Sequence, residues 1–427
     1  MTKIRTTVFG CIALAGLAAS ASADIATDWN TTALNAIKTG AVPPPLASRA
    51  LAIVHTAMYD ANNAITKSRQ SYLPIPAAAA GASREAAVAQ AARDVLVGLF
   101  PAQAAAFDSQ LTTHLGGIDP GQSRNDGVSL GSTVAANFLA FRATDGSAAP
   151  TPWTPGSSST SWQPTGASAI PLFNQFCTVQ PWTMSSCSQF RQTAPPLPGS
   201  AEYNAAYAEV KALGQNSSAT RTADQTEIAK FWAAGGGTVT PPGMWNSIAQ
   251  IVSAQQTTTF DDNLRLFAVL NMATADAAVC SWDMKYTYDY FRPVTAIRAT
   301  EDPSWTPLLP TPQFQAYSSG HSTFSSAGAA VLAAMYGDSV AFDLTVTDPS
   351  LGLVEVTRSF SSFSAAAAEA GQSRIYGGIH WQFDNTSGLA AGAQVGAQAY
   401  ANFLNVPAPG AAGLLALAAV AGIRRRR

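Results

Sequence analysis

The sequence has 427 residues, of which 47% are hydrophobic and 12% are charged. A chain of this length and composition can bury a large core, which excludes a disordered or fibrous protein. Six of the 24 basic residues lie in residues 1–23 and 424–427, so the body keeps 18 basic against 26 acidic side chains. An acidic body lacks the positive surface that nucleic acids need, and we expect no nucleic-acid partner.

Residues 1–23 have the pattern of a secretory signal peptide. Lys3 and Arg5 precede an apolar run at 8–19, and small residues at 21–23 supply a cleavage site before Asp24. We therefore predict an exported protein, located in the periplasm, in the cell envelope or outside the cell.

Three cysteines remain after such a cleavage. Cys177 and Cys187 lie ten residues apart in a loop rich in proline and serine, and an oxidising compartment would let them form a disulfide. Cys280 is left over, and we expect it to be a small buried apolar residue.

Apolar residues recur at helical spacing through most of the body. We expect His55, within a helix over 49–64, to be a core histidine and not a ligand. Ser83 is a plausible N-cap for a helix reaching Phe100, and Pro101 begins the next short element. Further helices are predicted at 123–142, 201–213, 222–232, 244–254 and 259–290. Alternating Val, Ile and Thr runs are few, and no dinucleotide-binding or phosphate-loop glycine pattern occurs, so the chain reads as mainly helical.

Residues 145–200 interrupt the helical pattern with Pro, Ser, Thr and Trp. A stretch of this length is typical of a domain boundary or of a functional covering loop. Its large apolar rings favour a loop that packs onto the body, since a free linker would leave them in water; they are Trp153, Trp162, Phe173, Phe176 and Trp182.

Lys285 and Arg292 are seven residues apart, which corresponds to two turns of helix. We predict that both project from one face of the 259–290 helix before Pro293 ends it. Two cations on one face repel unless an anion or a carboxylate lies between them. The pair indicates either an anion site or, with Asp283 and Asp289, a salt-bridged surface.

Residues 317–321 precede an Ala/Ser-rich helix that we expect to begin near His321. Gly320 allows close approach to the backbone, the helix N-terminus offers free amides, and the Ser319 hydroxyl adds a donor. This is an anion cradle beside a histidine, although a Ser-Gly-His turn is also common as an ordinary loop.

Arg374, His380 and Asp384 form a third group. The Arg374 guanidinium suits a tetrahedral oxyanion, and a neutral His380 ring offers a nitrogen to a metal or a phosphorus. Asp384 follows four residues later, where a helix would let it fix the tautomer of His380. Taken alone, the group is also typical of a salt-bridged helix end.

Together the three segments are similar to the tripartite signature of the vanadium-dependent haloperoxidases and the related acid and lipid phosphatases. Ser318 stands where the signature has Pro, which we expect to loosen that turn. Trp282 and Phe314 match pocket positions of the chloroperoxidase-like members. The resemblance extends over most of 24–404; its central residues are Lys285, Arg292-Pro293, Ser319-Gly320-His321, Ser373-Arg374, Gly378, His380 and Asp384.

The resemblance implies an all-α fold of two four-helix bundles with long irregular loops and an oxyanion site in the core of the C-terminal bundle. It implies vanadate as the cofactor, with phosphate able to compete, and hydrogen peroxide and halide as the reaction partners. His380 would bond the vanadium, His321 would act as general acid–base, and Lys285 would polarise the bound oxidant. Asp384, Trp282 and Phe314 would surround the site. The residues implied to bind the anion's oxygens are Lys285, Arg292, Ser319, Gly320 and Arg374.

Residues 405–427 are similar to a PEP-CTERM sorting signal. A Pro-Ala-Pro-Gly motif at 407–410 precedes an apolar stretch ending at Ile423 and four arginines, with Ala408 where that signal usually has Glu. The resemblance implies that envelope sorting machinery acts on the tail; an ordinary short membrane anchor is the alternative. The expected organisation is a signal peptide at 1–23, a helical domain at 24–404 with its active-site segments at 282–384, and a tail at 405–427.

The leading functional prediction is a haloperoxidase that makes hypohalous acid. One alternative keeps the pocket but makes His380 a nucleophile that takes a phosphoryl group while His321 protonates the leaving oxygen, which describes a phosphatase. The other is a non-catalytic envelope protein on the same scaffold. The haloperoxidase is favoured by Trp282, Phe314 and the long amino-terminal half.

Overall fold

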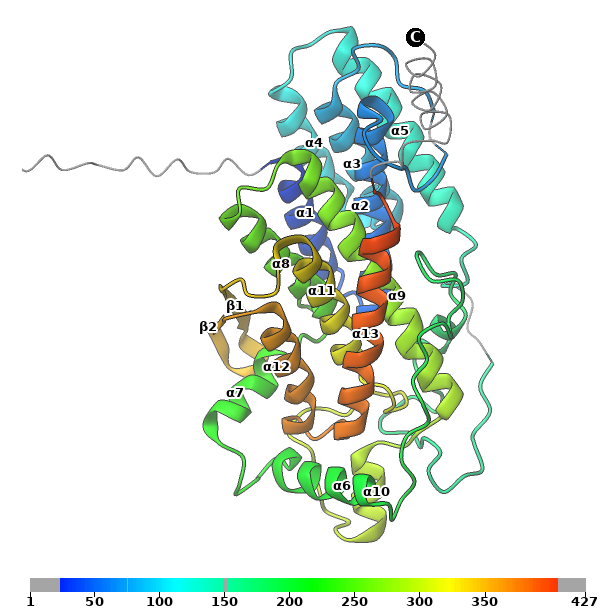
Figure 1. Cartoon of the computed structure of the whole chain (residues 1–427), viewed down its shortest axis with the longest axis vertical. Coiled ribbons are helices and arrows are strands. Elements are labelled where there is room, and N and C mark those ends of the chain that lie inside the picture. The colour runs from blue at the N-terminus through cyan, green and yellow to red at the C-terminus, as the bar shows by residue number, and fades with distance from the viewer. Residues whose placement is uncertain (1–23, 75, 149–151, 406–427) are drawn as a thin grey trace, which may run out of the picture.

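The fold is mainly helical, as predicted (Figure 1). The computed structural model describes residues 24–405 except 75 and 149–151; the predicted signal peptide and nearly all of the predicted tail therefore lie outside the described residues. In the described residues the helices are α1 (Ile25–Thr39), α2 (Pro44–Thr66), α3 (Arg84–Leu99), α4 (Ala104–Gly116), α5 (Gln122–Arg142), α6 (Ala201–Gly214), α7 (Ala223–Phe231), α8 (Thr240–Gln255), α9 (Phe260–Tyr288), α10 (Pro293–Thr300), α11 (Gly320–Tyr336), α12 (Phe363–Tyr376) and α13 (Gln382–Asn402), with short 3-10 turns at Pro101–Gln103, Asn174–Cys177 and Pro349–Leu351.

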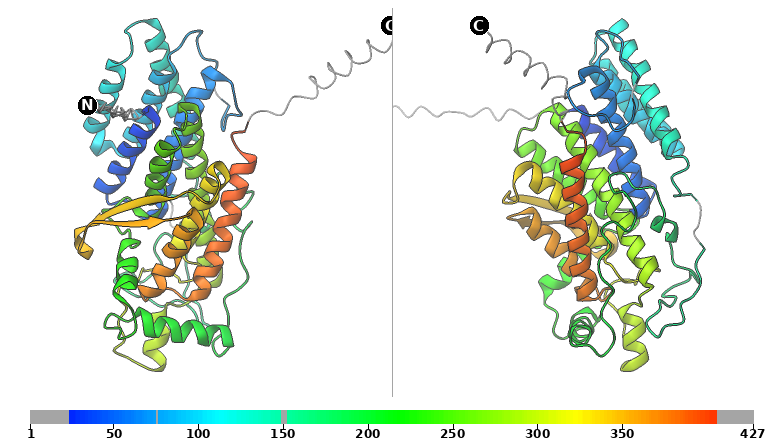
Figure 2. Two further views of the ribbon diagram at one scale, coloured as in Figure 1. Left: turned by 60° about the vertical axis from the view of Figure 1, so that its left-hand side comes forward. Right: turned by 45° about the vertical axis from the view of Figure 1, so that its right-hand side comes forward.

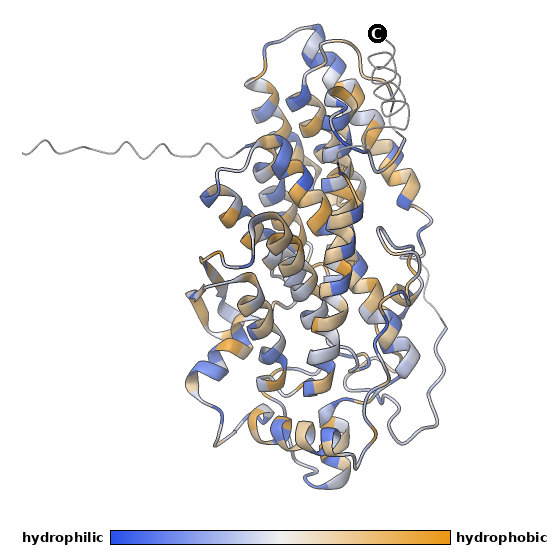
Figure 3. Ribbon diagram, viewed as in Figure 1, coloured by the Kyte–Doolittle hydropathy of each residue, from blue (hydrophilic) through white to orange (hydrophobic). Residues whose placement is uncertain are grey.

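Two bundles share the long helix α9. In the first, α2 packs against α3, α5 and α9, and α1 and α8 also pack against this group; in the second, α11 packs against α9, α12 and α13. Helix α9 is long and apolar enough to span a membrane, but its apolar window is completely buried in the body, as expected of a core helix. The ribbons of the outer helices carry both apolar and polar stretches (Figure 3), as amphipathic packing requires.

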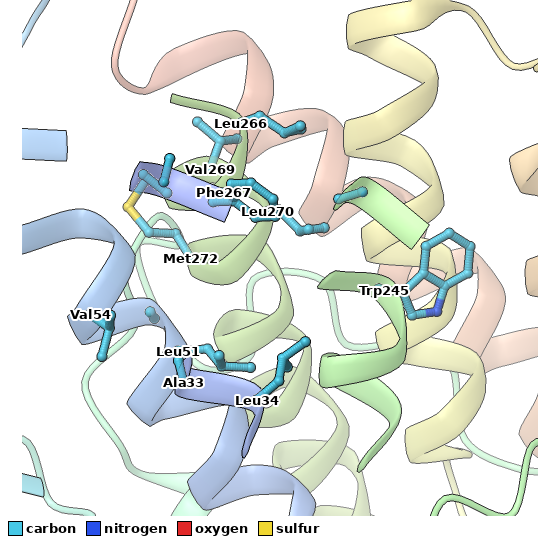
Figure 4. Close-up of a cluster of buried hydrophobic side chains, with 14 of the residues drawn as sticks. Ala33, Leu34, Leu51, Val54, Trp245, Leu266, Phe267, Val269, Leu270 and Met272 are labelled. Carbon is cyan, nitrogen blue, oxygen red and sulfur yellow. The ribbon is translucent and has the colours of Figure 1, made fainter. Parts of the chain in front are cut away.

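The core of the first bundle is built around the N-terminal half of α9. Phe267 and Leu270 lie among side chains from α1, α2 and α8, including Leu51 and Trp245 (Figure 4). His55 is 1% exposed and stacks on the Phe267 ring, with 5.2 Å between ring centroids, so its prediction as a core histidine is confirmed. Ser83 caps α3 by accepting a hydrogen bond from the Ala86 amide, also as predicted.

A β-hairpin was not predicted. Strands β1 (Phe342–Asp348) and β2 (Leu353–Phe360) pair antiparallel, and the hairpin projects from the helical body in the left view of Figure 2. Apolar residues at its base, Phe342 and Phe360, are buried. The hairpin lies between α11 and α12 in the chain, so it adds to the second bundle without replacing any of its helices.

The loop at 145–200 packs onto the body as expected. Trp162, Phe176 and Trp182 are almost fully buried. The carboxylate of Asp276, on α9, accepts hydrogen bonds from three consecutive backbone amides at 182–184 and from the Thr183 hydroxyl. A buried carboxylate with four donors holds the loop against α9.

The predicted disulfide between Cys177 and Cys187 is wrong. Cys187 is a thiol, and its Sγ donates to the Val179 carbonyl of the same loop at 3.6 Å. Burial, together with the charge of Asp283, raises the pKa of the Cys187 thiol, which disfavours the reactive thiolate. Cys280 is fully buried on α9, as expected.

Candidate active site

The three sequence segments converge in the core of the second bundle. Lys285 lies in the last turn of α9, and Arg374 lies in the last turn of α12. Ser319 is the N-cap of α11, so Gly320 and His321 form its first turn. His380 lies between α12 and α13, and Asp384 lies in the first turn of α13. Helix ends therefore supply most of the predicted residues.

The expectation that Lys285 and Arg292 share one helix face is wrong. Helix α9 ends at Tyr288, because Asp289 adopts a left-handed conformation with φ 44°. Arg292 is the extended N-cap of α10, and Pro293 occupies the first turn of that helix, a position that suits proline. The two cations meet because both donate to the backbone of 314–318.

His380 is held as a neutral imidazole. Its Nδ1 lies 2.8 Å from Asp384 Oδ2, which also accepts from the Trp381 amide at 3.0 Å. Burial and the charges of Arg292, Lys285 and Arg374 hold the pKa of His380 well below its usual range. Because Nδ1–H donates to the carboxylate, Nε2 carries the lone pair; it accepts from Arg292 Nη1 at 3.0 Å. The predicted pairing of His380 with Asp384 is confirmed.

Two buried guanidinium groups retain donors without a partner. Arg292 donates to the carbonyls of Phe314 and Ile379, but its Nη2 has no hydrogen-bond acceptor among the described residues. Arg374 donates to the Trp232 carbonyl at 3.5 Å, and its Nε has no acceptor in the part of the chain that the structure describes. Burial lowers the pKa of both groups to about 9, so both stay charged at neutral pH. Buried charges with free donors fit an oxyanion, which would accept charge-assisted hydrogen bonds from both.

Lys285 is placed differently from the other cations. Its Nζ donates to the carbonyls of Gln315, Ala316 and Ser318, at 2.9, 3.0 and 2.5 Å. An ammonium has three protons, so these bonds use all of its donors. Burial and the charge of Arg292 lower the pKa of Lys285 well below its usual value. As placed, Lys285 supports the turn before α11, and its contribution to an anion is its charge.

The turn at Ser318 is firmly held, in contrast to the loosening expected from the missing proline. Ser318 is fully buried, and its carbonyl accepts from both Lys285 and the Ser281 hydroxyl. The peptide bond between Tyr317 and Ser318 is cis.

The first turn of α11 has room for a small group beside Trp282. The Ser319 amide donates to the Asp384 carbonyl at 3.0 Å, which ties the α11 N-terminus to α13. A Cβ added to Gly320 would come no closer than 3.6 Å to any neighbour, and that neighbour is the Trp282 ring. Gly320 therefore leaves a space that a side chain would fill, next to the positive end of a helix.

His321 is arranged to accept a proton at Nδ1. Its Nε2 lies 3.2 Å from the Ala233 carbonyl, so Nε2 carries the hydrogen and Nδ1 is left with the lone pair. Burial, together with the charge of Arg374, lowers the pKa of His321 well below its usual value, which keeps the ring neutral.

Aromatic rings form one wall of the site. Trp282 and Phe314 pack with 5.1 Å between ring centroids, and Lys285 Nζ lies 5.2 Å from the Phe314 centroid. Phe173 and Phe176 of the 145–200 loop contact Trp282 edge to face. The covering loop therefore contributes to this wall.

Sequence reasoning missed the backbone carbonyls that orient these side chains. The carbonyls of Trp232 and Ala233 hold Arg374 and His321, and those of 315–318 hold Lys285. A carbonyl is present at every residue, so only the fold reveals which of them matter. Among the described residues there is no group of three or more His, Cys, Asp or Glu side chains arranged to hold a metal ion.

A helical bundle that buries two guanidiniums, a lysine and a neutral histidine around free donors has the chemistry to hold an oxyanion. Residues 265–407 match the family model described as the VCPO second helical-bundle domain. The vanadium chloroperoxidase of Curvularia inaequalis is 26% identical over 246 residues, which cover 43% of this chain and 40% of that protein. The chain thus aligns with well under half of that relative's length.

Solved structures extend the similarity to nearly the whole chain. The first bacterial vanadium-dependent iodoperoxidase superposes with a TM-score of 0.81 at 26% identity, covering 91% of this chain and 99% of that one. A holo bacterial vanadium-dependent chloroperoxidase superposes with a TM-score of 0.69 at 18% identity, covering 84% and 91%, and shares the fold. The chain is therefore similar to the vanadium haloperoxidases in sequence over its second bundle, and in fold over most of its length.

Proposed function

We propose that this protein is a vanadate-dependent haloperoxidase that oxidises halide with hydrogen peroxide to hypohalous acid. The observation that carries the proposal is the pairing of unpartnered buried donors on Arg292 and Arg374 with a neutral His380 whose tautomer Asp384 fixes. The relatives named above are a chloroperoxidase and an iodoperoxidase, which supports halide as the substrate class.

The residues fit a bound vanadate. His380 Nε2 would bond the metal, and Arg292, Arg374, the Ser319 hydroxyl and the Gly320 amide would bind the oxygens, with the charge of Lys285 close by. When bound, vanadate supplies Lewis-acid activation of peroxide.

The side chains of the chain supply the proton transfer and the charge balance. His321 Nδ1 accepts a proton from hydrogen peroxide, because its lone pair is free and its ring is neutral. Asp384 holds the Nδ1–H of His380, so the Nε2 lone pair stays available. The cations balance negative charge in a buried site that water screens poorly. Trp282 and Phe314 exclude water on one side.

Export to the periplasm, the cell envelope or the exterior remains part of the proposal. It is supported by the basic and apolar pattern of residues 1–23, and the pattern of residues 405–427 supports envelope sorting.

The phosphatase alternative uses the same donors, since phosphate and vanadate are both tetrahedral oxyanions. Assaying wild type and His321→Ala with bromide plus peroxide, and with nitrophenyl phosphate, separates the two. We expect His321→Ala to lose halide oxidation at least about 100-fold, the usual contribution of a general base, and to keep binding vanadate through His380 and the arginines.

Two results would contradict the proposal. In one, vanadate-loaded wild type oxidises neither bromide nor iodide while the metal-free protein hydrolyses the phosphate ester efficiently. In the other, His321→Ala oxidises bromide as fast as wild type. A protein with neither activity would support the non-catalytic alternative.

A further inference from the structure

The connection between α7 and α8 lies directly behind the site. Two consecutive carbonyls at the end of α7 point at site residues: Trp232 O accepts from Arg374 Nη1 at 3.5 Å, and Ala233 O accepts from His321 Nε2 at 3.2 Å. Within the described part of the chain, Arg374 has no other hydrogen-bond acceptor, so this carbonyl sets where its guanidinium lies.

The backbone around these carbonyls has little rigidity of its own. Three glycines follow at 235–237, and both Ala234 and Gly237 have positive φ, 45° and 84°. Glycine runs have high conformational freedom, so carbonyls beside one keep their direction only if something else fixes the chain.

The Trp232 side chain supplies that anchor. It is 1% exposed, and its indole Nε1 donates to Glu369 Oε1 at 3.0 Å. The Glu369 carboxylate in turn accepts from Nε and Nη2 of Arg358, at 2.8 and 2.9 Å. Arg358 also pairs with Asp224 and Glu227 of α7. Because Arg358 lies on β2 and Glu369 on α12, this cluster joins the hairpin, α7 and α12 behind the site.

We infer that Trp232 is a positioning residue for the oxyanion site: its indole, fixed by Glu369, directs the two carbonyls that orient Arg374 and His321. The inference rests on the proposed function, because it takes these two side chains to serve a bound oxyanion. It applies equally to vanadate and to phosphate. It also gives the β-hairpin a role, since Arg358 reaches the site only through Glu369 and Trp232.

The first test compares two tryptophan substitutions. Trp232→Phe keeps an aromatic ring and removes the indole N–H. Trp245→Phe is the matched control, because Trp245 is also fully buried but its Nε1 has no hydrogen-bond partner in residues 24–405 as far as they are described. Both variants lose the same atoms, and only one of them loses the anchor.

The second test changes Glu369, which is partly exposed. Glu369→Gln and Glu369→Leu both lose the ion pair with Arg358, but only Gln keeps an oxygen that can accept from the indole. The difference in anion affinity between these two variants isolates the hydrogen bond to Trp232. This comparison remains valid if Trp232→Phe fails to fold.

The readout is the affinity for inorganic phosphate and for vanadate, measured by calorimetry on full-length protein at a temperature where circular dichroism shows each variant folded. We expect Trp232→Phe and Glu369→Leu to bind both anions about tenfold more weakly, a change equivalent to 1.4 kcal/mol. Trp245→Phe and Glu369→Gln should stay within about threefold of wild type.

Failure of this inference can be distinguished from failure of the proposed function. Unchanged affinity in Glu369→Leu, or equal losses in Trp232→Phe and Trp245→Phe, would overturn the inference while leaving halide oxidation unaffected. Wild type that binds phosphate but oxidises no halide would overturn the proposed function and keep the inference. Wild type that binds neither anion would overturn both.

Discussion

Replacing Arg374 with methionine should make the anion-free protein more stable and a poorer anion binder. Arg374 is 4% exposed, and within the described residues it has one long hydrogen bond and an Nε without a partner. A buried charge with so few partners is held at a cost to folding that only an anion would offset. Methionine has a similar volume and no charge.

The pKa shift sets the upper limit of the effect. Burial lowers the pKa of Arg374 from 12.5 to about 9, a change of about 3.5 units. At 1.36 kcal/mol per unit, holding the charge in the folded state costs about 5 kcal/mol at neutral pH. The substitution removes this cost, but losing the hydrogen bond to Trp232 offsets part of the gain in stability. Replacing buried charges with apolar groups typically stabilises a fold by 1–4 kcal/mol. We therefore expect Arg374→Met to raise the free energy of unfolding by roughly 2 kcal/mol.

Urea unfolding in phosphate-free buffer measures the stability, and calorimetry measures phosphate affinity, which should fall about 10- to 100-fold with the loss of charge-assisted bonds. Arg292→Met is the matched control. Burial lowers the pKa of Arg292 to the same value. Without Arg292, however, the carbonyls of Phe314 and Ile379 and the Nε2 of His380 lose their hydrogen-bond donor, so this variant should be less stable than wild type. An Arg374→Met protein that is less stable than wild type, or that binds phosphate equally well, would refute the reasoning.

Four further predictions concern other residues. His380→Ala should leave the circular dichroism spectrum unchanged and abolish vanadium retention; metal analysis after dialysis that finds one vanadium per chain would disprove the role of His380. Gly378→Ala should destabilise the fold by at least ~2 kcal/mol in urea unfolding, because Gly378 has φ 77° and a Cβ there would lie 2.2 Å from the Gly214 carbonyl. Gly320→Ala, where no such contact exists, should keep wild-type stability and lose phosphate affinity. Burial raises the pKa of Asp60 from 3.8 to about 7, so its contribution to stability is complete below pH 4 and is lost as the pH rises through 7. Relative to wild type, Asp60→Asn should therefore gain stability between pH 4 and 7, at up to ~1.4 kcal/mol per pH unit, and a constant difference between the two unfolding curves would disprove this.

Most helices could be predicted because their apolar residues recur at the helical period and their ends carry recognisable caps. The helix at Arg84–Leu99 begins after the Ser83 cap, as expected. The end of α9 was misplaced because its apolar pattern continues to Tyr290, whereas the break is set by the left-handed backbone at Asp289. The hairpin was missed although Leu344 and Val346 alternate with polar residues, because the run is short and lies between Ala-rich helices.

The site could be predicted as a set of residue types but not as a geometry. The spacing of His380 and Asp384 was enough to predict their contact, since it depends on a single helical turn. The engagement of Lys285 with three carbonyls could not be predicted, because it depends on how the turn at 315–318 folds against α9. The thiol of Cys187 shows the same limit, because nearness in sequence and a predicted oxidising compartment do not determine where a sulfur atom points.

The most direct test of the central claim is a vanadate titration of the dialysed wild-type protein, followed by peroxide-dependent bromination of an indicator dye. We predict that activity rises with added vanadate, saturates at one vanadate per chain, and is inhibited competitively by phosphate. Absence of bromide and iodide oxidation at saturating vanadate would contradict the claim, and so would activity that does not depend on vanadate.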